Sequence, residues 1–398
     1  TLLLTPSLSY DAKYAFVTLT QQDASSGGGT GGGGTTPPGL KETPNEFAVA
    51  KAFDIGHKAD SAKFVSALLG LDQFTKAADL KSALDRMSGE NNADISTAAL
   101  LAGRQFINQF QQHSLLTRDT SDVWDVWGSF YTQTGRLDGD GNTHDMRGGA
   151  TGGAGGVDYR ISPSFRIGAS LGYGSSHFDL SENTGRGRLN YTDVAVTGDY
   201  TDGATYASGL LGGAFGTGST SRDVSLPGLP ARATAHVSNS QFLAAFEVGH
   251  KLWLDDDWTV TPFAGLDIGA VDQQGFTEKG AGALNLQVAG DNQTGTQSIL
   301  GARFGTDIPM GSILLNTDVK VGWSHEFSTS HTITQSFAGT PGTGFTIEGA
   351  SLPGDSAVLG AGIATKVSET GQAYIRYDGE FGDKVESHAF TAGFRFTW

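Results

Sequence analysis

The chain has 398 residues, with Gly 58, aromatic residues at 10% and hydrophobic residues at only 38%, which suits a sheet with one aromatic face and one small or polar face. Its net charge of -16 argues against nucleic acid as a partner, because nothing would neutralise the phosphates. Cys 0 excludes disulfide frameworks and thiolate metal sites. The sequence contains no run of about 18 apolar residues, so it predicts no transmembrane helix. Membrane-spanning β-strands remain compatible with this composition.

Residues 1–24 contain short apolar runs at 2–4 and 14–19, broken by turn residues, and this pattern predicts strands. Two or three strands cannot bury a core alone, so we expect this piece to be the end of something longer. Residues 25–42 include SSGGGTGGGGTTPP and predict a flexible linker.

Residues 43–92 predict a region of short helices. Thr43, Pro44 and Glu46 supply an N-cap, a first-turn proline and a capping-box acid for a helix that runs to about residue 53. Further helical patterns follow at 61–69 and 75–87, and Gly89 ends the last of them.

Residues 93–118 predict one long amphipathic helix. Its apolar face carries Ile95, Ala98, Ala99, Ala102, Phe106 and Phe110, and its other face carries Gln105, Asn108, Gln109 and Gln112. The uninterrupted part would be roughly 35 Å long, enough to cross a bilayer-thick object. Arg104 and the many amides make the helix too polar for lipid, so it requires a polar sleeve.

From residue 123 onward the hydrophobic period changes to two and stays so to the last residue. We predict twelve strands, at 123–135, 147–161, 165–179, 187–201, 204–218, 235–252, 257–272, 294–308, 311–326, 355–368, 371–381 and 387–398. Their connections alternate between tight turns and longer segments, as periplasmic turns and extracellular loops do in an outer-membrane barrel.

The two faces of these strands differ in chemistry. In the third strand Phe165, Leu171 and Tyr173 point one way, whereas Arg166 and Ser170 point the other. Twelve strands with the apolar side chains inside would enclose more space than those side chains fill, so the apolar face must lie outside, in lipid. We therefore predict an all-β membrane protein, a 12-stranded antiparallel transmembrane β-barrel over 119–398 with the helix of 93–118 through its lumen.

Alternation also assigns charged residues to the lumen. The inward set is Asp158, Arg160, Arg166, Arg303, Lys320, Arg376 and Arg395. We expect Arg104 to meet acids such as Asp158, Asp193 or Asp318, and the lumen cations to face the helix amides.

Several segments together resemble the translocator unit of the monomeric autotransporters, the type Va secretion family. They are the ending FTAGFRFTW, the strands AYIRYDGEF and VGWSHEF, the hairpin VDYRISPSFRIGASLGYGSS, the loop LDGDGN, and LKSALDRMSGENNADISTAALLAGRQF upstream. Residues 1–24 likewise resemble the last rungs of a passenger β-helix in that family. The order of these parts is more specific than any one motif.

The resemblance implies a monomeric bacterial outer-membrane barrel that serves the secretion and surface display of its own passenger, with residues 1–92 extracellular. The implied partners are outer-membrane lipid, periplasmic chaperones and the barrel-assembly machinery, which recognises a C-terminal strand ending in an aromatic residue. The residues that fit this assembly signal are Phe390, Phe394, Phe396 and Trp398.

Some autotransporters resemble one another in releasing the passenger by asparagine cyclisation inside the pore. Asn91 and Asn92 are the candidate pair here. They precede the long helix, whose length would place them at the outer mouth, so we favour a helix N-cap region over a cleavage site.

No pattern predicts a catalytic residue, a metal site or a cofactor. Gly168, Ser170 and Gly172 match the G-x-S-x-G nucleophile motif, but they lie in mid-strand rather than at a strand-to-helix turn. Asp138 and Asp140 suggest a calcium loop without the glycine and the terminal acid that an EF-hand needs. The alternatives kept open are an outer-membrane barrel enzyme, a surface protease or lipase with its site on the extracellular rim, and a surface adhesin.

Overall fold

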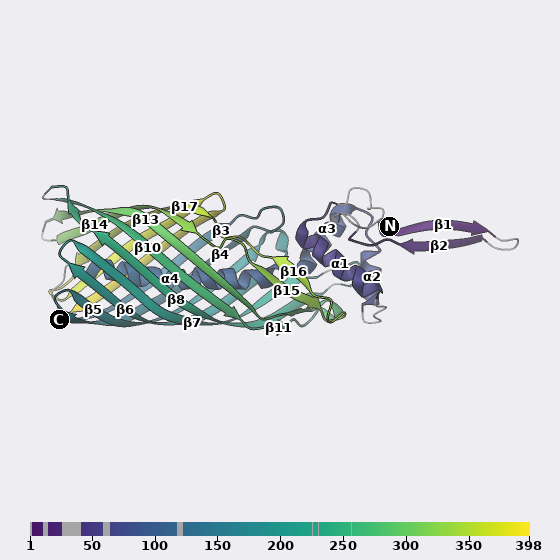
Figure 1. Ribbon diagram of the computed structural model, residues 1–398, viewed down its shortest axis with the longest axis horizontal. Helices are drawn as coiled ribbons and strands as arrows, with labels where there is room; N and C mark the ends of the chain where they lie inside the picture. Colours follow the sequence, from purple (N-terminus) through teal and green to yellow (C-terminus); the bar gives the residue numbers. More distant parts are fainter. Residues whose placement is uncertain are drawn as a thin grey trace.

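The computed structural model describes residues 2–10, 15–25, 41–58, 64–117, 122–224, 226–229, 231–255, 257–311 and 313–398. The molecule is elongated (Figure 1): a barrel at one end, a group of short helices over one of its mouths, and an N-terminal hairpin beyond them. The linker predicted for 25–42 lies outside the described residues except at 25, 41 and 42.

Twelve strands form the closed barrel, each paired antiparallel with its neighbours. They are β3 (Trp124–Leu137), β4 (Met146–Ser162), β5 (Phe165–Leu180), β6 (Arg186–Asp202), β7 (Thr205–Asp223), β8 (Arg232–His250), β10 (Trp258–Gln273), β13 (Asp291–Met310), β14 (Ile313–Glu326), β17 (Asp355–Lys366), β18 (Gly371–Gly382) and β19 (Val385–Thr397). The predicted barrel is confirmed, with strand ends that differ by a few residues. Closure pairs β19 with β3, so the backbone N–H of Trp124 donates to the carbonyl of Trp398 at 3.0 Å.

The barrel wall has an apolar outer face and a polar inner face. Along β5 the outward Leu171 and Tyr173 are 64% and 63% exposed, while Arg166 and Ser170, which point inward, are 5% and 4% exposed. This pattern is the reverse of a soluble barrel, and it suits strands whose outer face lies in lipid. Among the described residues no helix is long and apolar enough to cross a membrane.

Helix α4 (Glu90–Thr117) lies inside the barrel and extends toward the mouth that carries the longer loops (Figure 1). It begins three residues earlier than predicted, because Gly89 adopts a left-handed conformation (φ 71°) that ends one helix and lets the next start at once. Asn91 and Asn92 therefore lie in the first turn of α4 rather than before it. This corrects the predicted boundary between 43–92 and 93–118.

Three short helices, α1 (Pro44–Lys58), α2 (Val65–Leu71) and α3 (Ala77–Ser88), cover that mouth. They pack on a four-stranded sheet made by the long loops, which contains β11 (Phe276–Thr277), β12 (Leu286–Val288), β15 (Thr332–Phe337) and β16 (Phe345–Glu348). Phe53 and Phe337 meet at the centre, with ring centroids 5.1 Å apart. We call these helices and loop strands the cap.

Strands β1 (Leu4–Tyr10) and β2 (Ala15–Gln21) form an antiparallel hairpin at the far end. That residues 1–24 are the end of a passenger stays a prediction. Rungs of a β-helix stack in parallel, whereas these two strands pair antiparallel. The reason is the four-residue connection at 11–14, since parallel pairing needs a crossover of a dozen or more residues.

Replacing Gly89 with alanine should destabilise the junction between α3 and α4 by about 2 kcal/mol. The positive φ disfavours a side chain, and the added Cβ would collide with Leu286 Cδ1. We expect hydrogen exchange of the α3 amides to quicken by about 30-fold in the protein held in detergent micelles. Gly203→Ala is the control, because Gly203 also has a positive φ of 56° but nothing within 4 Å of the new Cβ. Equal hydrogen-exchange rates of the α3 amides in the wild type and in Gly89→Ala would contradict the role assigned to Gly89.

Candidate functional site

Helix α4 fills the lumen, and most of its side chains are buried. The residues of its predicted apolar face are divided between two hydrophobic clusters that include wall residues. Ile95, Ala98 and Ala99 belong to a cluster near the capped mouth. Phe106 and Phe110 belong to a cluster deeper in the barrel. Ala102 is also buried and Gln109 is fully buried, whereas Asn108 and Arg104 are half-buried.

The wall makes room for this helix with small residues. A Cβ added to Gly172 would come within 2.7 Å of the Phe106 ring, so the ring occupies the space that a side chain at that wall position would need. The middle residue of the G-x-S-x-G match, Ser170, is buried in mid-strand and makes no strand-to-helix turn. The motif therefore belongs to a wall of small residues.

One ion pair fixes the middle of the helix to the wall. Arg104 Nη2 pairs with Glu326 Oε2 at the end of β14, and the Glu326 side chain is only 1% exposed. Glu326 also accepts the backbone N–H of Thr296 at 2.9 Å. The prediction that Arg104 meets Asp158, Asp193 or Asp318 is wrong, because alternation says which residues point inward but not at what height along the barrel.

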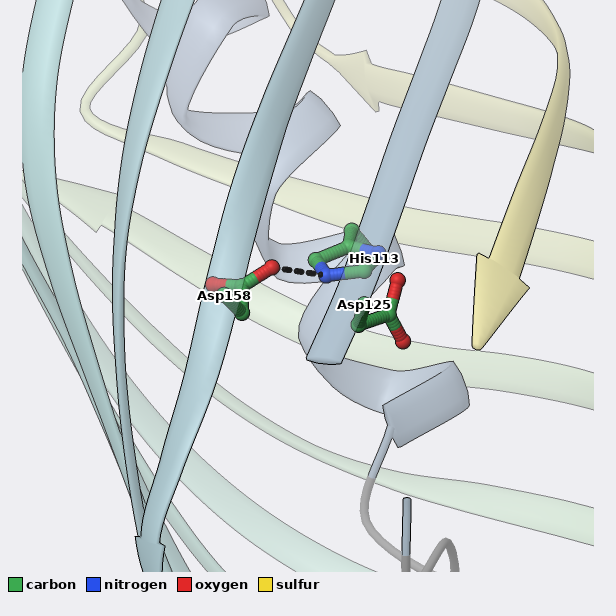
Figure 2. Close-up of side chains that lie close together, drawn as sticks. All are labelled: His113, Asp125 and Asp158. Carbon is green, nitrogen blue, oxygen red and sulfur yellow. Dashed lines mark hydrogen bonds and ion pairs between the residues drawn. The ribbon is translucent and has the colours of Figure 1, made fainter. Parts of the chain in front are cut away.

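A second contact fixes the periplasmic third of the helix (Figure 2). His113 Nε2 lies 2.7 Å from Asp158 Oδ2, and the imidazole stacks on the ring of Trp127 with centroids 4.6 Å apart. Asp125 lies beside them, and the guanidinium groups of Arg166 and Arg395 approach its carboxylate at 3.5 and 3.3 Å. The sequence analysis missed His113, although it continues the face of Phe106 and Phe110 at helical spacing.

His113, Asp125 and Asp158 each offer a ligand atom within 4.8 Å of the others, which is compact enough for a metal ion. A divalent cation there would face the two fixed charges of Arg166 and Arg395. Because these guanidiniums already neutralise Asp125, the cluster suits a contact between helix and wall better than a metal centre.

The helix amides bind wall acids and hydroxyls rather than wall cations. Gln111 Nε2 donates to Asp267 at 3.2 Å and Gln112 Nε2 donates to Asp378 at 3.0 Å. Gln109 Nε2 donates to the hydroxyl of Thr391 at 3.3 Å.

The lumen cations mostly pair with acids of the wall itself. The pairs are Arg303 with Glu247 at 2.7 Å, Lys320 with Asp378 at 2.8 Å, and Arg376 with Asp318 at 2.8 Å. Arg160 donates to the carbonyls of Ser162 and Pro163 in the β4–β5 turn. Among the predicted cations only Arg395 has a described hydrogen bond to the helix, at the carbonyl of Leu116, where the negative end of the helix dipole favours a cation. The expectation that these cations face the helix amides is wrong, because the wall carboxylates beside them are charged and therefore stronger acceptors than an amide oxygen.

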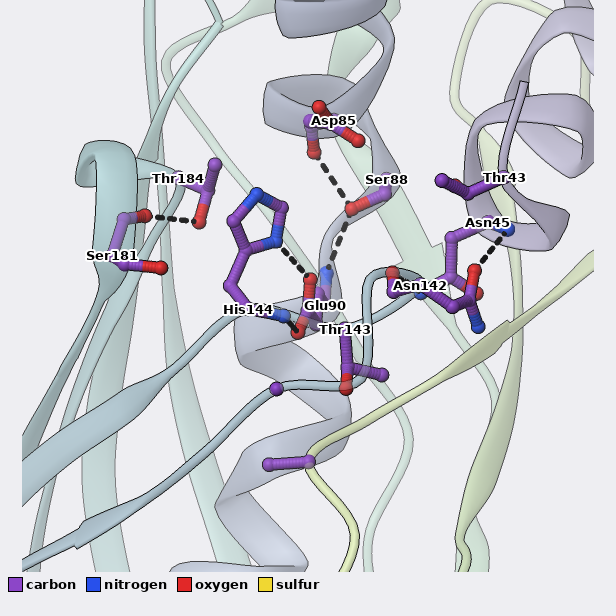
Figure 3. Close-up of polar contacts among 12 residues, drawn as sticks. Thr43, Asn45, Asp85, Ser88, Glu90, Asn142, Thr143, His144, Ser181 and Thr184 are labelled. Atoms are coloured by element: carbon purple, nitrogen blue, oxygen red, sulfur yellow. Dashed lines mark hydrogen bonds and ion pairs between the residues drawn. The ribbon is translucent and has the colours of Figure 1, made fainter. Parts of the chain in front are cut away.

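The outer end of α4 is tied to the loop between β3 and β4 (Figure 3). Glu90 accepts from the backbone N–H of His144 at 2.6 Å and lies 2.7 Å from its Nδ1. Asn45 of α1 donates three bonds: its backbone N–H and its Nδ2 donate to Asn142, and its Nδ2 also donates to the carbonyl of Glu348. We call the Glu90–His144 contact the latch. Burial lowers the pKa of His144, but the hydrogen bond and charge of Glu90, with the nearby acids, outweigh it and raise the pKa to about 9.

Asn92 is held at this mouth by its own hydrogen bonds. Its Nδ2 donates to Glu278 at 3.0 Å and its Oδ1 accepts from Thr220 at 3.0 Å. Glu278 in turn pairs with the fully buried Arg222 at 2.7 Å. These bonds hold the side-chain amide of Asn92, and the neighbouring Asn91 is also buried. The arrangement therefore suits a structural anchor of the first helical turn.

The acids and histidines of the rim are engaged in loop structure. Asp140 accepts the backbone N–H groups of Asn142 and Thr143 at 3.0 and 3.1 Å, which closes its loop. Asp138 pairs with Arg136, and His331 lies 3.2 Å from Asp291. Within the described residues these groups do not converge on a common point.

The outer face of β19 carries the predicted assembly signal. Phe390, Phe394, Phe396 and Trp398 are 58%, 44%, 43% and 60% exposed. The aromatic rings of this strand therefore face the surroundings of the barrel.

This closed barrel, filled by a helix of its own chain, has the architecture of two solved translocators. The translocator domain of autotransporter NalP from Neisseria meningitidis matches with a TM-score of 0.62 at 15% identity, covering 78% of this chain and 100% of that one. The beta domain of the Bordetella autotransporter Brka matches with a TM-score of 0.53 at 23% identity, covering 70% and 100%. At these identities the likeness shows the fold alone.

The family Autotransporter beta-domain matches residues 126–378, and the chain belongs to this family. It is an outer-membrane translocator unit, with its passenger side exposed on the cell surface.

Two curated relatives are larger proteins. An extracellular serine protease of Serratia marcescens is 23% identical over 334 residues, which are 82% of this chain and 31% of that protein. Esterase EstA of Pseudomonas aeruginosa is 24% identical over 226 residues, which are 55% and 33%. The chain spans about a third of the length of the curated relatives it matches.

Removing the arginine of the central ion pair should loosen the helix. Arg104→Gln leaves the Glu326 carboxylate buried without a counter-charge, which should cost about 3 kcal/mol. We expect a lower urea midpoint for the loss of the heat-modifiable, folded band on gels. The double variant Arg104→Met/Glu326→Met should recover most of the loss, because it removes both charges. A single variant as stable as the wild type would contradict the role assigned to this pair.

The latch should weaken at alkaline pH. The folded pKa of His144 lies above the unfolded value of 6.5, so its stabilisation is complete below about pH 6.5 and is lost as the pH rises through about 9. We expect the thermal midpoint of the helical signal to fall over this range, because deprotonation of His144 removes the charge that Glu90 binds. His144→Gln should remove this dependence, and a wild-type midpoint that stays constant from pH 6.5 to 9.5 would refute it.

Proposed function

We propose that this barrel exports the polypeptide joined to its N-terminal side, then anchors it in the outer membrane with α4 closing the pore. The direction in which α4 runs through the barrel is the main support for this proposal. Helix α4 ends near the mouth where β3 begins and both barrel ends meet, and it begins at the mouth covered by the long loops. The described residues N-terminal to Glu90 thus lie beyond the barrel on the loop side. Because long loops are extracellular in such barrels, that side is the cell exterior.

The fit of the helix supports closure after export. The contacts of Arg104 and His113 hold α4 at two heights, and the cap covers the outer mouth. At the other mouth a cavity of about 550 Å³ remains below the end of the helix, lined by Leu116, Arg303 and Arg376 among others. Within the described residues α4 occupies the lumen and the cap covers its outer mouth, so this state suits the end of transport rather than its course.

The hairpin of β1 and β2 supports a passenger at the N-terminal side. Its register places Leu8 opposite Val17 and Pro6 opposite Leu19 on one face, and Leu8, Val17 and Leu19 are each about 60% exposed. An isolated two-stranded hairpin is marginally stable in water, and this apolar face requires cover. We propose that residues 1–24 are the C-terminal end of the passenger, that 25–42 is the linker, and that preceding chain covers the face.

The proposed partners follow from the outer face of the barrel. The exposed apolar belt of the strands suits outer-membrane lipid. The aromatic end of β19 suits recognition by the barrel-assembly machinery, with periplasmic chaperones carrying the unfolded chain. We propose a monomer, because the single chain closes its own barrel and fills its own lumen.

We propose that this part of the protein has no catalytic role. The rim residues that an enzyme would need are bound into loops, as Asp140 and His331 are. The protease and esterase activities named for the two relatives belong to longer proteins, of which the matched segments are 31% and 33%. An enzymatic activity of the whole protein, or a role as an adhesin, would depend on the passenger.

The export test uses a signal peptide and a foldable reporter placed ahead of Lys41. External protease should remove the reporter from intact cells. Deleting Phe396 and Trp398 should abolish both digestion and the heat-modifiable barrel band, because the last strand no longer presents its aromatic end. Lys366→Gln, a substitution at an exposed position, serves as the folded control. A reporter that stays protected while the barrel inserts normally would overturn the proposal and favour the enzyme alternative.

A further inference from the structure

A small cavity lies inside the barrel, between α4 and the wall formed by the neighbouring strands β6, β7 and β8. Its volume is about 10 Å³, which is room for one water-sized particle. The side of α4 that lines it carries Ala99, Ala102 and Gly103. These small residues leave the space open, because a Cβ added to Gly103 would come within 2.7 Å of the Gln241 side-chain amide.

The wall of the cavity has small residues on its middle strand, β7, and polar residues on the two strands beside it. The two cross-strand rows, taken from β6 to β8, are Tyr191–Gly216–Asn239 and Asp193–Ala214–Gln241. Neighbouring strands lie about 4.8 Å apart, so the polar side chains of β6 and β8 can reach toward one another over β7.

Asp193 is the charged residue of this cavity, and it is only 1% exposed. Within the described residues its carboxylate accepts no hydrogen bond and joins no ion pair, and its Oδ1 is buried. Arg104 lies next to Gly103 on α4, but its guanidinium reaches the far wall and pairs with Glu326 of β14. A buried carboxylate without a counter-charge is strongly unfavourable.

Other buried acids of the lumen have arginine partners. They are Glu247 with Arg303, Glu326 with Arg104, and Asp125 with Arg166 and Arg395. No described side chain balances the charge of Asp193 in this way, so its counter-charge must come from solution.

Two side-chain amides line the cavity with Asp193 and can supply neutral oxygen ligands. Asn239 and Gln241 are 8% and 6% exposed, and their amide nitrogens have no hydrogen-bond partner among the described residues. A side-chain amide can turn either its oxygen or its nitrogen toward a ligand. Here that turn sacrifices no hydrogen bond of the nitrogen.

We propose that this cavity binds a monovalent metal cation of about the size of Na⁺, held by the Asp193 carboxylate and the amide oxygens of Asn239 and Gln241. Carboxylate and amide oxygens are the ligands that hard cations prefer. One carboxylate balances one positive charge, so a divalent ion would leave an uncompensated charge in the lumen. The bound cation joins β6 to β8 beneath α4 and holds the helix at this height. The site belongs to the helix-filled barrel and is independent of export.

The test uses the full chain folded in zwitterionic detergent micelles, with NaCl replacing choline chloride at constant ionic strength. The cation must leave when α4 leaves the wall, so Na⁺ should slow the hydrogen exchange of the α4 amides. The slowing should reach about 100-fold at a Na⁺ concentration of about 100 times the Kd. CsCl should give no slowing, because Cs⁺ is too large for the cavity, and the protein should broaden the ²³Na NMR signal.

Asp193→Asn keeps the shape of the side chain and removes its charge, so exchange in this variant should be independent of Na⁺. Gly103→Ala keeps the charge but narrows the cavity, and it should weaken the Na⁺ effect. Asp202→Asn, at the exposed periplasmic end of β6, is the matched control and should keep the full effect. All three variants are checked for the heat-modifiable band.

Two outcomes would overturn the proposal. One is equal exchange of the wild type in choline and throughout the Na⁺ titration, which is the result expected if Asp193 is protonated beside a water molecule. The other is a Na⁺ effect that persists undiminished in both Asp193→Asn and Gly103→Ala, since the cation would then bind elsewhere.

Discussion

A polar helix enclosed by a membrane barrel must have its charges and amides paired within the protein, because few water molecules can reach them. Helix α4 meets this constraint at successive heights, through Arg104 with Glu326, Gln112 with Asp378 and His113 with Asp158. Each partner lies on a different strand, so together they fix both the depth and the rotation of the helix. A helix shifted by one turn would leave several buried charges unpaired.

The same constraint explains the composition of the wall. Inward positions hold either charged side chains that pair with one another, such as Arg303 with Glu247, or glycines that admit the rings of α4, such as Gly172. Outward positions hold the apolar side chains that lipid accepts. A chain with few hydrophobic residues can therefore be a membrane protein, since only one face of one layer must be apolar.

The cap covers the outer mouth of the barrel and is held together mainly by apolar packing rather than by ion pairs. Its core is apolar and aromatic, centred on Phe53, Phe64 and Phe337, and only its edge uses polar contacts such as Glu90 with His144. The barrel thus bears charges inside and hydrophobic residues outside, whereas the cap has the ordinary order of a globular domain. Gly89 marks the point in the chain where one arrangement gives way to the other.

The twelve strands, their inward and outward faces and the long helix could be predicted from local periods of 2 and 3.6 and from turn residues. It also indicated which charges point inward, as for Arg166 and Arg376. The contacts of Arg104 with Glu326, 222 residues away, and of His113 with Asp158 became visible in the folded chain alone. Such pairings depend on strand register, barrel tilt and the depth of α4, which no local pattern encodes. The start of α4 at Glu90 and the antiparallel pairing of β1 with β2 were likewise settled by the φ of one glycine and by a short connection.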